Sequence, residues 1–350
     1  MKSVHIAARS LKNISNVLRG IPAVILANLL LTRRCTQNCL QCTIPQDSGD
    51  TPFMEMANFT RLVDMFDRHG TQFVSLSGGE PILHQHIDEC IRYATQKQFV
   101  HVQLLSTLYA SKPVVEKVVD VLLETGAGIQ VSFDGFGEVA DTLRGATNVS
   151  DTVQWGMELI TRKNKQRRKP VRTSANIVLS KLNLHQTDRI LNYIECLGWK
   201  CNVDLYRWTS ENTNEVQDLK IEDNREFKDA LDRIIGSPAV TTPTFIIEHF
   251  TDYLKGDVPK RCPYLDSRGL GTKIYVNPEC SVSVCIGKPF GNLLEQSPVE
   301  FFRSKEWSDR IKMMRACKGC WNSCYTPSGI VFHPGSISDL KAIWEIVRKG

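Results

Sequence analysis

Three cysteines stand close together near the N-terminus, at residues 35–42, which read CTQNCLQC. Thiolates at this CxxxCxxC spacing can all bind one metal centre. A structural zinc ion takes four protein ligands, yet the next cysteine is Cys90 and the nearest histidines are His5 and His69. Three thiolates therefore favour a [4Fe–4S] cluster, with one iron left open for a substrate or cofactor, over a structural zinc ion.

A pair of glycines follows the next apolar segment, at residues 77–81, which read SGGEP. Paired glycines allow a ligand to approach the backbone closely, and a glutamate such as Glu80 can accept hydrogen bonds from an ammonium group. Pro81 is suited to the first turn of a helix. A tight strand-to-helix turn is the simpler alternative, but the place of this segment one strand–helix unit after the cysteines favours a ligand site.

Six further cysteines lie near the C-terminus, at positions 262, 280, 285, 317, 320 and 324. The N-terminal region has no signal peptide, because its basic residues are spread from Lys2 to Arg19 and no cleavage site follows an apolar stretch. Without export, clustered cysteines indicate metal ligands rather than disulfides. The sequence therefore predicts a soluble, cytoplasmic metalloprotein.

The overall composition is that of a folded protein with more than one domain. The chain has 350 residues, enough for two domains, and 42% of them are hydrophobic. The 43 basic and 38 acidic residues leave a net charge of +5, too small to indicate a nucleic-acid partner by itself. The longest apolar run, residues 21–32, is interrupted by Pro22 and Asn28 and is too short to cross a bilayer.

Apolar strand-like segments alternate with longer helical patterns from residue 24 to about 207. The expected strands are 24–32, 73–77, 100–105, 128–133, 171–178 and 201–206. The expected helices between them include 58–69, 83–97, 113–125, 151–163 and 184–197. Continuously apolar strands are typical of parallel sheets, and strand–helix repeats of this length form right-handed βαβ units. Six units predict an α/β fold with a curved, partly closed (β/α)6 barrel.

Together, the cysteine loop, the SGGEP segment and the strand–helix order resemble the radical S-adenosylmethionine (radical SAM) superfamily, whose partial TIM-like barrel would span residues 24 to about 206. The resemblance implies that Cys35, Cys39 and Cys42 bind a [4Fe–4S] cluster whose open iron binds the amino and carboxylate groups of S-adenosylmethionine. Reductive cleavage of this cofactor would give a 5′-deoxyadenosyl radical that abstracts hydrogen from a substrate. The electron would come from an external reductant such as flavodoxin or ferredoxin.

The same resemblance assigns residues to the cofactor. The segment 77–80 would contact the methionyl amine, and the strand end at 131–135 with Arg144 would meet the methionyl carboxylate, for which a guanidinium offers a planar fork. Gln41 departs from the family, which commonly has an aromatic side chain there beside the adenine. The implied cofactor-binding residues are Ser77, Gly78, Gly79, Glu80, Ser106, Ser132 and Arg144.

The C-terminal cysteines resemble the auxiliary-cluster extension called SPASM, or its shorter twitch form. In that extension a cysteine, a hairpin with Gly-x4-Cys, a Gly-Asn-hydrophobic segment and a CxxC recur in this order. The implied ligands of an auxiliary [4Fe–4S] cluster are Cys262, Cys285, Cys317 and Cys320, with Cys280 and Cys324 as alternatives. A zinc ribbon is the other interpretation of paired cysteines. The cluster would transfer electrons, as in an oxidoreductase, or anchor the substrate.

These elements predict three regions along the chain. They are a basic N-terminal helix at residues 1–23, the barrel at 24–236 and the cysteine-rich domain at 237–350, which includes a hairpin at 273–284. Apolar residues such as Leu11 and Leu18 share one face of the first helix. This pattern favours packing under the barrel over contact with a membrane surface.

The substrate is less strongly indicated than the chemistry. Peptide-modifying relatives often carry an N-terminal peptide-recognition domain, for which a first strand near Val24 leaves no room. We therefore expect a small molecule, such as a sugar or lipid-like compound, with a ribosomally made peptide or protein as the alternative. Residues that end the sixth strand and face its mouth, Asp204, Tyr206 and Arg207, are candidate substrate contacts.

A zinc-stabilised module that binds nucleic acid through the basic run at 162–169 is a remote alternative. That run precedes a strand, which places it at the end of the barrel opposite the active face. The SGGEP segment would also have no role in such a module, so we expect no nucleic-acid partner.

Overall fold

One eight-stranded sheet forms the centre of the computed structural model, in the order β6-β5-β4-β3-β2-β1-β7-β8. The structure describes residues 2–44, 53–207, 214–258, 261–265, 269–285, 288–317, 321–332, 334 and 337–349. The strands are β1 (Val24–Leu30), β2 (Phe73–Ser77), β3 (His101–Ser106), β4 (Gly128–Ser132), β5 (Thr173–Leu179), β6 (Lys200–Leu205), β7 (Thr272–Val276) and β8 (Val282–Ser283). The first six are parallel to one another, which confirms the predicted α/β architecture.

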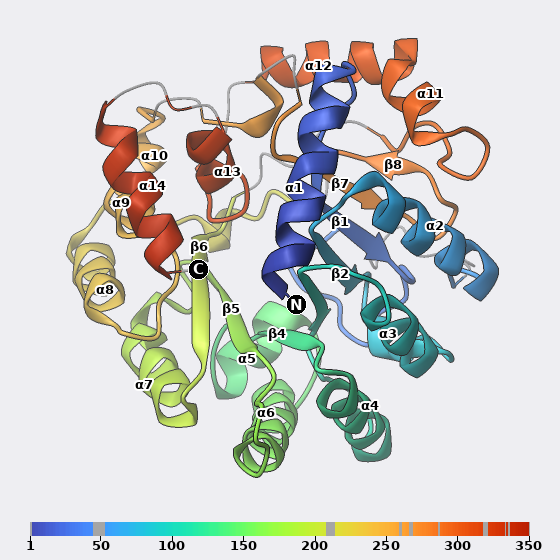
Figure 1. Cartoon of the computed structure of the whole chain (residues 1–350). Helices are drawn as coiled ribbons and strands as arrows, with labels where there is room; N and C mark the ends of the chain where they lie inside the picture. Colours follow the sequence, from blue (N-terminus) through green and yellow to red (C-terminus); the bar gives the residue numbers. More distant parts are fainter. Residues whose placement is uncertain are drawn as a thin grey trace.

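Helices cover the outer face of the curved sheet (Figure 1). Those between consecutive strands are α2 (Met56–His69), α3 (Ile87–Thr95), α4 (Lys112–Thr125), α5 (Gly137–Arg144), α6 (Val149–Lys165) and α7 (Thr187–Leu197), with the short η1 (Pro81–Leu83) and η2 (Leu184–Gln186). Each of the five expected helices is present, although the one predicted over 83–97 begins only at Ile87. Several end at a glycine in the left-handed region, such as Gly70 after α2, because glycine adopts this conformation without strain.

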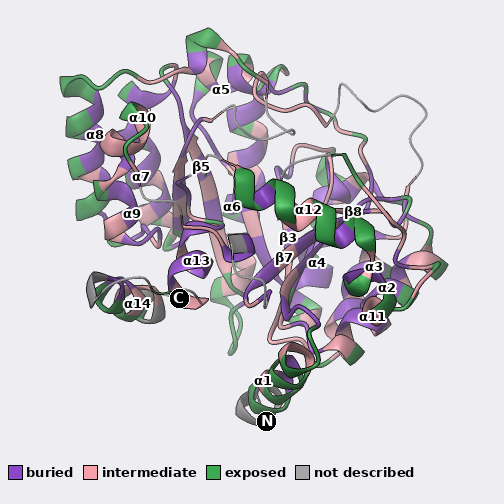
Figure 2. Cartoon of the chain, turned by 90° about the horizontal axis from the view of Figure 1, so that it is seen from above, coloured by how far each residue is buried: buried purple, intermediate pink, exposed green. Residues whose placement is uncertain are grey.

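The chain beyond β6 is mostly helical. It contains η3 (Gln217–Leu219), α8 (Arg225–Gly236), α9 (Thr244–Glu248), α10 (Phe250–Lys255), η4 (Pro263–Leu265), α11 (Pro298–Arg303), α12 (Lys305–Ala316), α13 (Thr326–Phe332) and α14 (Ile337–Lys349). Seen from above, buried residues fill the space around the sheet, and exposed residues lie along the outer sides of the helices (Figure 2). The core is therefore built between the sheet and its helical cover.

The expected hairpin at 273–284 is present as β7 and β8, but it does not form a sheet of its own. Strand β7 pairs in parallel with β1, with Ile274 opposite Ala27, and β8 returns antiparallel to β7. Ile274 and Val276 are fully buried. The hairpin thus covers an edge of the barrel sheet that would otherwise expose unpaired backbone groups, and it brings the C-terminal region to the barrel.

Helix α1 (Lys2–Leu18) crosses the sheet at the end where the strands begin (Figure 1). The buried Arg9 guanidinium donates to the backbone oxygens of Gln98, at 2.5 Å, and of Thr71, which precede β3 and β2. Asn16 donates to the His69 oxygen at 2.8 Å. The helix therefore packs under the barrel, but through polar side chains and not through its apolar face. Within the described residues, no helix is long and apolar enough to span a membrane.

Candidate active site

A cavity of about 580 Å³ opens where the parallel strands end. Each of the strands β1 to β7 contributes at least one side chain to its wall. Because side chains alternate along a strand, Ser75 and Ser77 of β2 face the cavity, whereas Val74 and Leu76 are buried on the other side. The alternation gives the cavity a largely polar lining inside an apolar shell.

The cysteine loop forms one side of this cavity, and Cys35, Cys39 and Cys42 all line it. The loop is fixed on the end of α5 by backbone hydrogen bonds from Asn38 and Leu40 to the oxygens of Arg144 and Leu143, each 3.0 Å long. Burial raises the pKa of Cys35 to about 12, which a bound metal centre would have to overcome.

No three acidic, histidine or cysteine side chains in the described part of the chain converge closely enough to hold a single metal ion. An iron–sulfur cluster does not need such convergence, because each thiolate binds a separate iron.

The glycine pair allows the loop after β2 to lie directly against residues 32–34, which lead into the cysteine loop. A Cβ atom at Gly79 would lie 2.3 Å from the Arg34 oxygen, and one at Gly78 would lie 2.2 Å from the Thr32 oxygen. The Gly79 amide donates to the Thr32 oxygen at 2.8 Å. The glycines are thus required by the close approach of the chain's own backbone, and they line the cavity as well.

Glu80 points away from the cavity into the protein. Its fully buried carboxylate accepts hydrogen bonds from the Ser106 hydroxyl at 2.6 Å and from the amide and hydroxyl of Thr107 at 2.8 and 2.5 Å. Burial raises its pKa, and these hydrogen bonds oppose the rise. Ser106 and Thr107 face the cavity, so Glu80 supports the wall from behind.

Arg144 and Asp134 form a buried ion pair beside the cysteine loop. The second Asp134 oxygen accepts the Val178 amide at 2.8 Å, and Arg144 Nη1 lies 3.8 Å from Cys39 Sγ. Burial opposes the charge on Arg144, but attraction to Asp134 and Cys39 raises its pKa above the ordinary value. A guanidinium held in this way stays charged and can meet an anionic group in the cavity.

The structure brings together the site residues predicted within the barrel, but not the described C-terminal cysteines predicted to bind an auxiliary cluster. The residues that line the one cavity are Cys35, Cys39, Cys42, Ser77, Gly78, Gly79, Ser106, Ser132 and Arg144, with Glu80 directly behind Ser106. Their roles in binding a cluster and S-adenosylmethionine stay predictions. Their convergence means that one ligand could contact residues from several strands.

Three further polar residues on this wall were not identified from the sequence. The side chains of Asn28, Gln37 and Gln41 line the cavity, and each has a buried oxygen without a hydrogen-bond partner in the described structure. Buried polar atoms without partners are costly, so a polar ligand would stabilise them. The sequence signals were Asn28, a polar residue inside an apolar strand, and Gln41, which departs from the aromatic residue common in the family.

The C-terminal region supplies a second wall, which begins at β7 beside β1. Lys273 and Tyr275 of β7 line the cavity together with Ser323 and Cys324, which precede α13. The Lys273 ammonium group donates to the Cys324 oxygen, and the hydroxyls of Tyr275 and Tyr325 lie 3.1 Å apart. Burial lowers the pKa of Lys273, although the nearby Cys324 and Asp204 act in the opposite direction.

Two of the three candidate substrate contacts at the end of β6 are held by protein groups. The Asp204 carboxylate accepts the amide and hydroxyl of Ser323 at 2.7 and 2.5 Å. The buried Tyr206 hydroxyl accepts the Val216 amide at 2.7 Å. None of Asp204, Tyr206 and Arg207 is among the described residues that line the cavity. Asp204 instead positions Ser323, which does line it.

The other described C-terminal cysteines, at positions 262, 280, 285 and 317, lie outside the cavity. Burial and the proximity of Cys262 and Cys285 raise the pKa of Tyr264, and Cys324 and Cys285 act in the same direction on Tyr275. Cys262, Cys285 and Cys324 therefore lie around one group of tyrosines. Cys317 follows α12, Cys280 is buried at the hairpin turn, and Cys320 lies outside the described residues. A metal centre at these cysteines stays a prediction.

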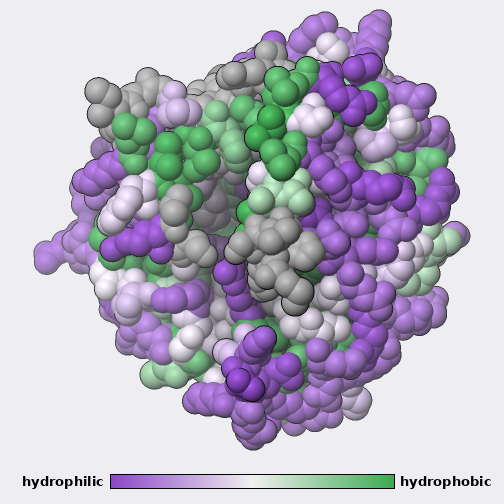
Figure 3. Space-filling view, in the orientation of Figure 1, coloured by the Kyte–Doolittle hydropathy of each residue, from purple (hydrophilic) through white to green (hydrophobic). Residues whose placement is uncertain are grey.

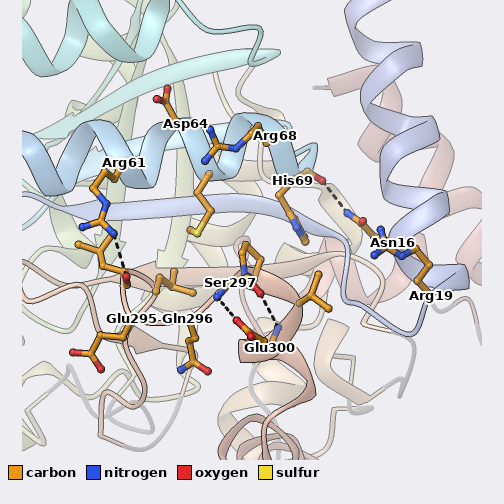
Figure 4. Close-up of a pocket in the computed structure, with 15 residues that line it drawn as sticks. Asn16, Arg19, Arg61, Asp64, Arg68, His69, Glu295, Gln296, Ser297 and Glu300 are labelled. Carbon is orange, nitrogen blue, oxygen red and sulfur yellow. Dashed lines mark hydrogen bonds between the residues drawn. The ribbon is translucent and has the colours of Figure 1, made fainter.

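A second hollow, of about 790 Å³, lies between α1, α2 and residues 293–300 (Figure 4). Its polar side chains are engaged separately and do not converge. Arg61 donates to the Leu294 oxygen at 3.1 Å, and the Ser297 hydroxyl and Glu300 carboxylate each accept a backbone amide of the other residue. The cavity at the strand ends is therefore the candidate active site.

Comparison with known sequences assigns the barrel to a superfamily. The sequence model described as Radical SAM superfamily matches residues 29–194. The PqqA peptide cyclase of Rhodopseudomonas palustris is 25% identical over 326 residues, which cover 86% of this chain and 80% of that protein. The mycofactocin maturase MftC of Mycobacterium tuberculosis is 22% identical over 202 residues, which cover 57% of this chain and 49% of that protein.

Solved structures show the same fold at lower identity. Streptococcus suis SuiB bound to precursor peptide SuiA has a TM-score of 0.64 at 13% identity, covering 92% of this chain and 76% of that chain. Native anSMEcpe with bound AdoMet has a TM-score of 0.62 at 14% identity, covering 93% of this chain and 96% of that chain. These likenesses confirm the predicted partial barrel.

Proposed function

The chain belongs to the radical SAM superfamily, and on that premise we propose that it modifies a ribosomally made peptide. The observation that carries the proposal is that the cysteine loop and a second wall of Lys273, Tyr275, Ser323 and Cys324 line the same cavity. The sequence alone favours a small molecule. The relatives named above include a peptide cyclase that covers 86% of this chain, and they support the peptide alternative better.

Enzymes of the radical SAM superfamily use two cofactors, a [4Fe–4S] cluster and S-adenosylmethionine. When bound, they supply one-electron chemistry that removes a hydrogen atom from the substrate. The residues that would hold them are the three cysteines of the loop, with Arg144 and Ser132 toward the carboxylate end of the cofactor. Asn28, Gln37 and Gln41 suit a polar ligand, because they offer buried hydrogen-bonding atoms without partners.

The second wall would hold the substrate. Lys273 provides an ammonium group that, among the described residues, is hydrogen-bonded only to the Cys324 oxygen and forms no ion pair. A partly buried ammonium group of this kind attracts a carboxylate or a peptide carbonyl. Tyr275 and Cys324 present a hydroxyl and a thiol to the same space, where either can donate or accept a hydrogen bond.

Net oxidation of the peptide is the finer part of the proposal. An oxidation must pass an electron from the substrate to an acceptor. The C-terminal cysteines, at positions 262, 285, 317 and 320 with Cys324 as an alternative, would hold an auxiliary cluster in that role. The group of tyrosines that Cys262, Cys285 and Cys324 share adjoins the cavity through Tyr275.

The test begins with anaerobic reconstitution, iron and sulfide quantification, and reduction by dithionite with S-adenosylmethionine. We expect release of 5′-deoxyadenosine, and none from a variant in which the three loop cysteines are alanine. The chain is then co-expressed with short peptides encoded beside its gene, and the masses of these peptides are measured by mass spectrometry. A peptide that loses the mass of hydrogen atoms only with the intact cysteine loop supports the proposal. Cofactor cleavage accompanied by conversion of a small molecule, with every such peptide unchanged, would contradict it.

A further inference from the structure

Helix α1 is packed the opposite way round from an ordinary amphipathic helix. Its inner face carries Arg9 and Asn13, exposed by only 3% and 7%, whereas Leu11, Ile14 and Leu18 on the outer face are exposed by 67%, 55% and 83%. Helices on the surface of a folded protein normally bury their apolar face. The outer stripe of α1 is therefore not explained by packing within this chain.

The orientation of α1 is fixed by the hydrogen bonds of its polar face. Arg9 binds the Gln98 and Thr71 oxygens and pairs with Asp67, and Asn16 binds the His69 oxygen. Turning the helix over would leave the backbone oxygens of Gln98, Thr71 and His69 without these donors, which is costly for buried polar groups. The apolar stripe consequently points away from the barrel.

A second helix, from the other end of the chain, adds apolar residues on the same side. Leu340 and Trp344 of α14 are exposed by 61% and 63%. In both ribbon views α1 and α14 lie on the face that is toward the viewer in Figure 1, and apolar surface gathers over both regions in Figure 3. We call the outer surface of these two helices the α1/α14 face.

Basic side chains border this apolar surface. Lys12 and Arg19 are exposed beside the stripe of α1, and Lys341 and Arg348 are exposed on α14, where Arg348 lies 5.0 Å from the centre of the Trp344 ring. Helix α1 has no acidic residue. The acidic side chains of α14 are bound by other groups of the protein.

Asp339 pairs with Arg261 at 3.3 Å, and Glu345 accepts the Thr244 amide at 2.6 Å. The charge on the α1/α14 face is thus positive. Two such faces would repel each other in a symmetric dimer.

We propose that the α1/α14 face docks on an anionic lipid bilayer. Apolar residues of a helix with basic borders enter the boundary between headgroups and acyl chains, and the basic groups bind the anionic headgroups. An exposed tryptophan such as Trp344 is suited to that boundary. Because α1 crosses the beginning of the strands and the cavity opens at their ends, a docked molecule would keep its active site accessible from the aqueous side.

Vesicle sedimentation of the anaerobically purified full chain tests the proposal. The probes are vesicles of equal parts phosphatidylglycerol and phosphatidylcholine, and vesicles of phosphatidylcholine alone. We expect binding to the first, weakened by salt, with at least tenfold less binding to the second, and a blue shift of tryptophan emission that Trp344→Phe removes. This test needs no substrate and no turnover, so it is independent of the proposed function.

Variants separate the apolar and ionic contributions. Leu11→Gln with Leu18→Gln should weaken binding at least tenfold, and Lys12→Gln about fivefold. Ile235→Gln on α8, exposed by 39%, is the matched control and should bind as the unmodified chain does. Thermal unfolding of each variant establishes that it is folded.

The proposal is overturned by equal binding to both kinds of vesicle, or by binding to neither. It is also overturned by a dimer in light scattering that the Leu11 and Leu18 changes convert to monomer, because a second copy would then cover the face.

Discussion

The two walls of the active-site cavity are built in different ways. The barrel wall consists of loops that follow successive strands and are joined by backbone hydrogen bonds, such as those from Asn38 to Arg144 and from Gly79 to Thr32. The second wall is added by the C-terminal region, through the pairing of β7 with β1 and the hydrogen bond from Lys273 to the Cys324 oxygen. A wall made by the barrel strands themselves suits a cofactor that does not change, whereas a wall added by a separate region can change with the substrate.

Removal of a loop cysteine should have the largest effect on the barrel wall. In Cys39→Ala the cluster would lose one of its three thiolates, so we expect about four fewer irons per chain and at least a hundredfold less 5′-deoxyadenosine. Cys196→Ala, at an exposed position on α7, should retain both. Full iron content in the Cys39 variant would show that the two walls do not differ in the way described.

The next largest effect is expected at the buried ion pair between Asp134 and Arg144, which lies behind the cysteine loop. Asp134→Asn leaves Arg144 buried without its carboxylate, so the free energy of unfolding should fall by about 3–5 kcal/mol. The matched control is Glu222→Gln, which breaks an exposed pair with Lys181 and should cost less than about 1 kcal/mol. Urea unfolding measures both. Equal losses would mean that Asp134 does not support the barrel wall.

The contact between the two barrel loops should be sensitive to a single methyl group. Gly79→Ala places a Cβ atom against the Arg34 oxygen, so the loops must separate, at a cost of about 1–3 kcal/mol. Gly236→Ala has open space around the new atom and should be neutral or slightly stabilising. Thermal unfolding of the two variants measures this cost. If Gly79→Ala leaves the unfolding temperature unchanged, the two loops are not closely packed at this point.

Changes in the C-terminal wall should spare cofactor chemistry. Lys273→Met keeps the length of the side chain but removes its charge, so 5′-deoxyadenosine release without substrate should stay within about twofold. The KM for a peptide substrate should rise about tenfold, because a charge-assisted hydrogen bond is lost. Loss of cofactor cleavage in this variant would place Lys273 with the barrel wall instead.

Much of the barrel wall was predictable from the sequence. The cysteine loop and the SGGEP segment follow neighbouring strands, and the ends of parallel strands meet at one edge of a sheet. Their proximity therefore follows from the strand–helix order alone. The orientation of Glu80 does not, because it depends on the Ser106 and Thr107 hydroxyls, which come from a different strand end.

The sequence by itself determined the order of strands and helices, the cysteine loop and the amphipathic pattern of α1. Only the tertiary structure decided that β7 extends the barrel sheet beside β1, that Lys273 and Ser323 reach the cavity, and that α1 turns Arg9 inward. The physical reason is the same in each case. A periodic pattern shows that a helix or strand has two faces, but the groups that another segment presents decide which face is buried.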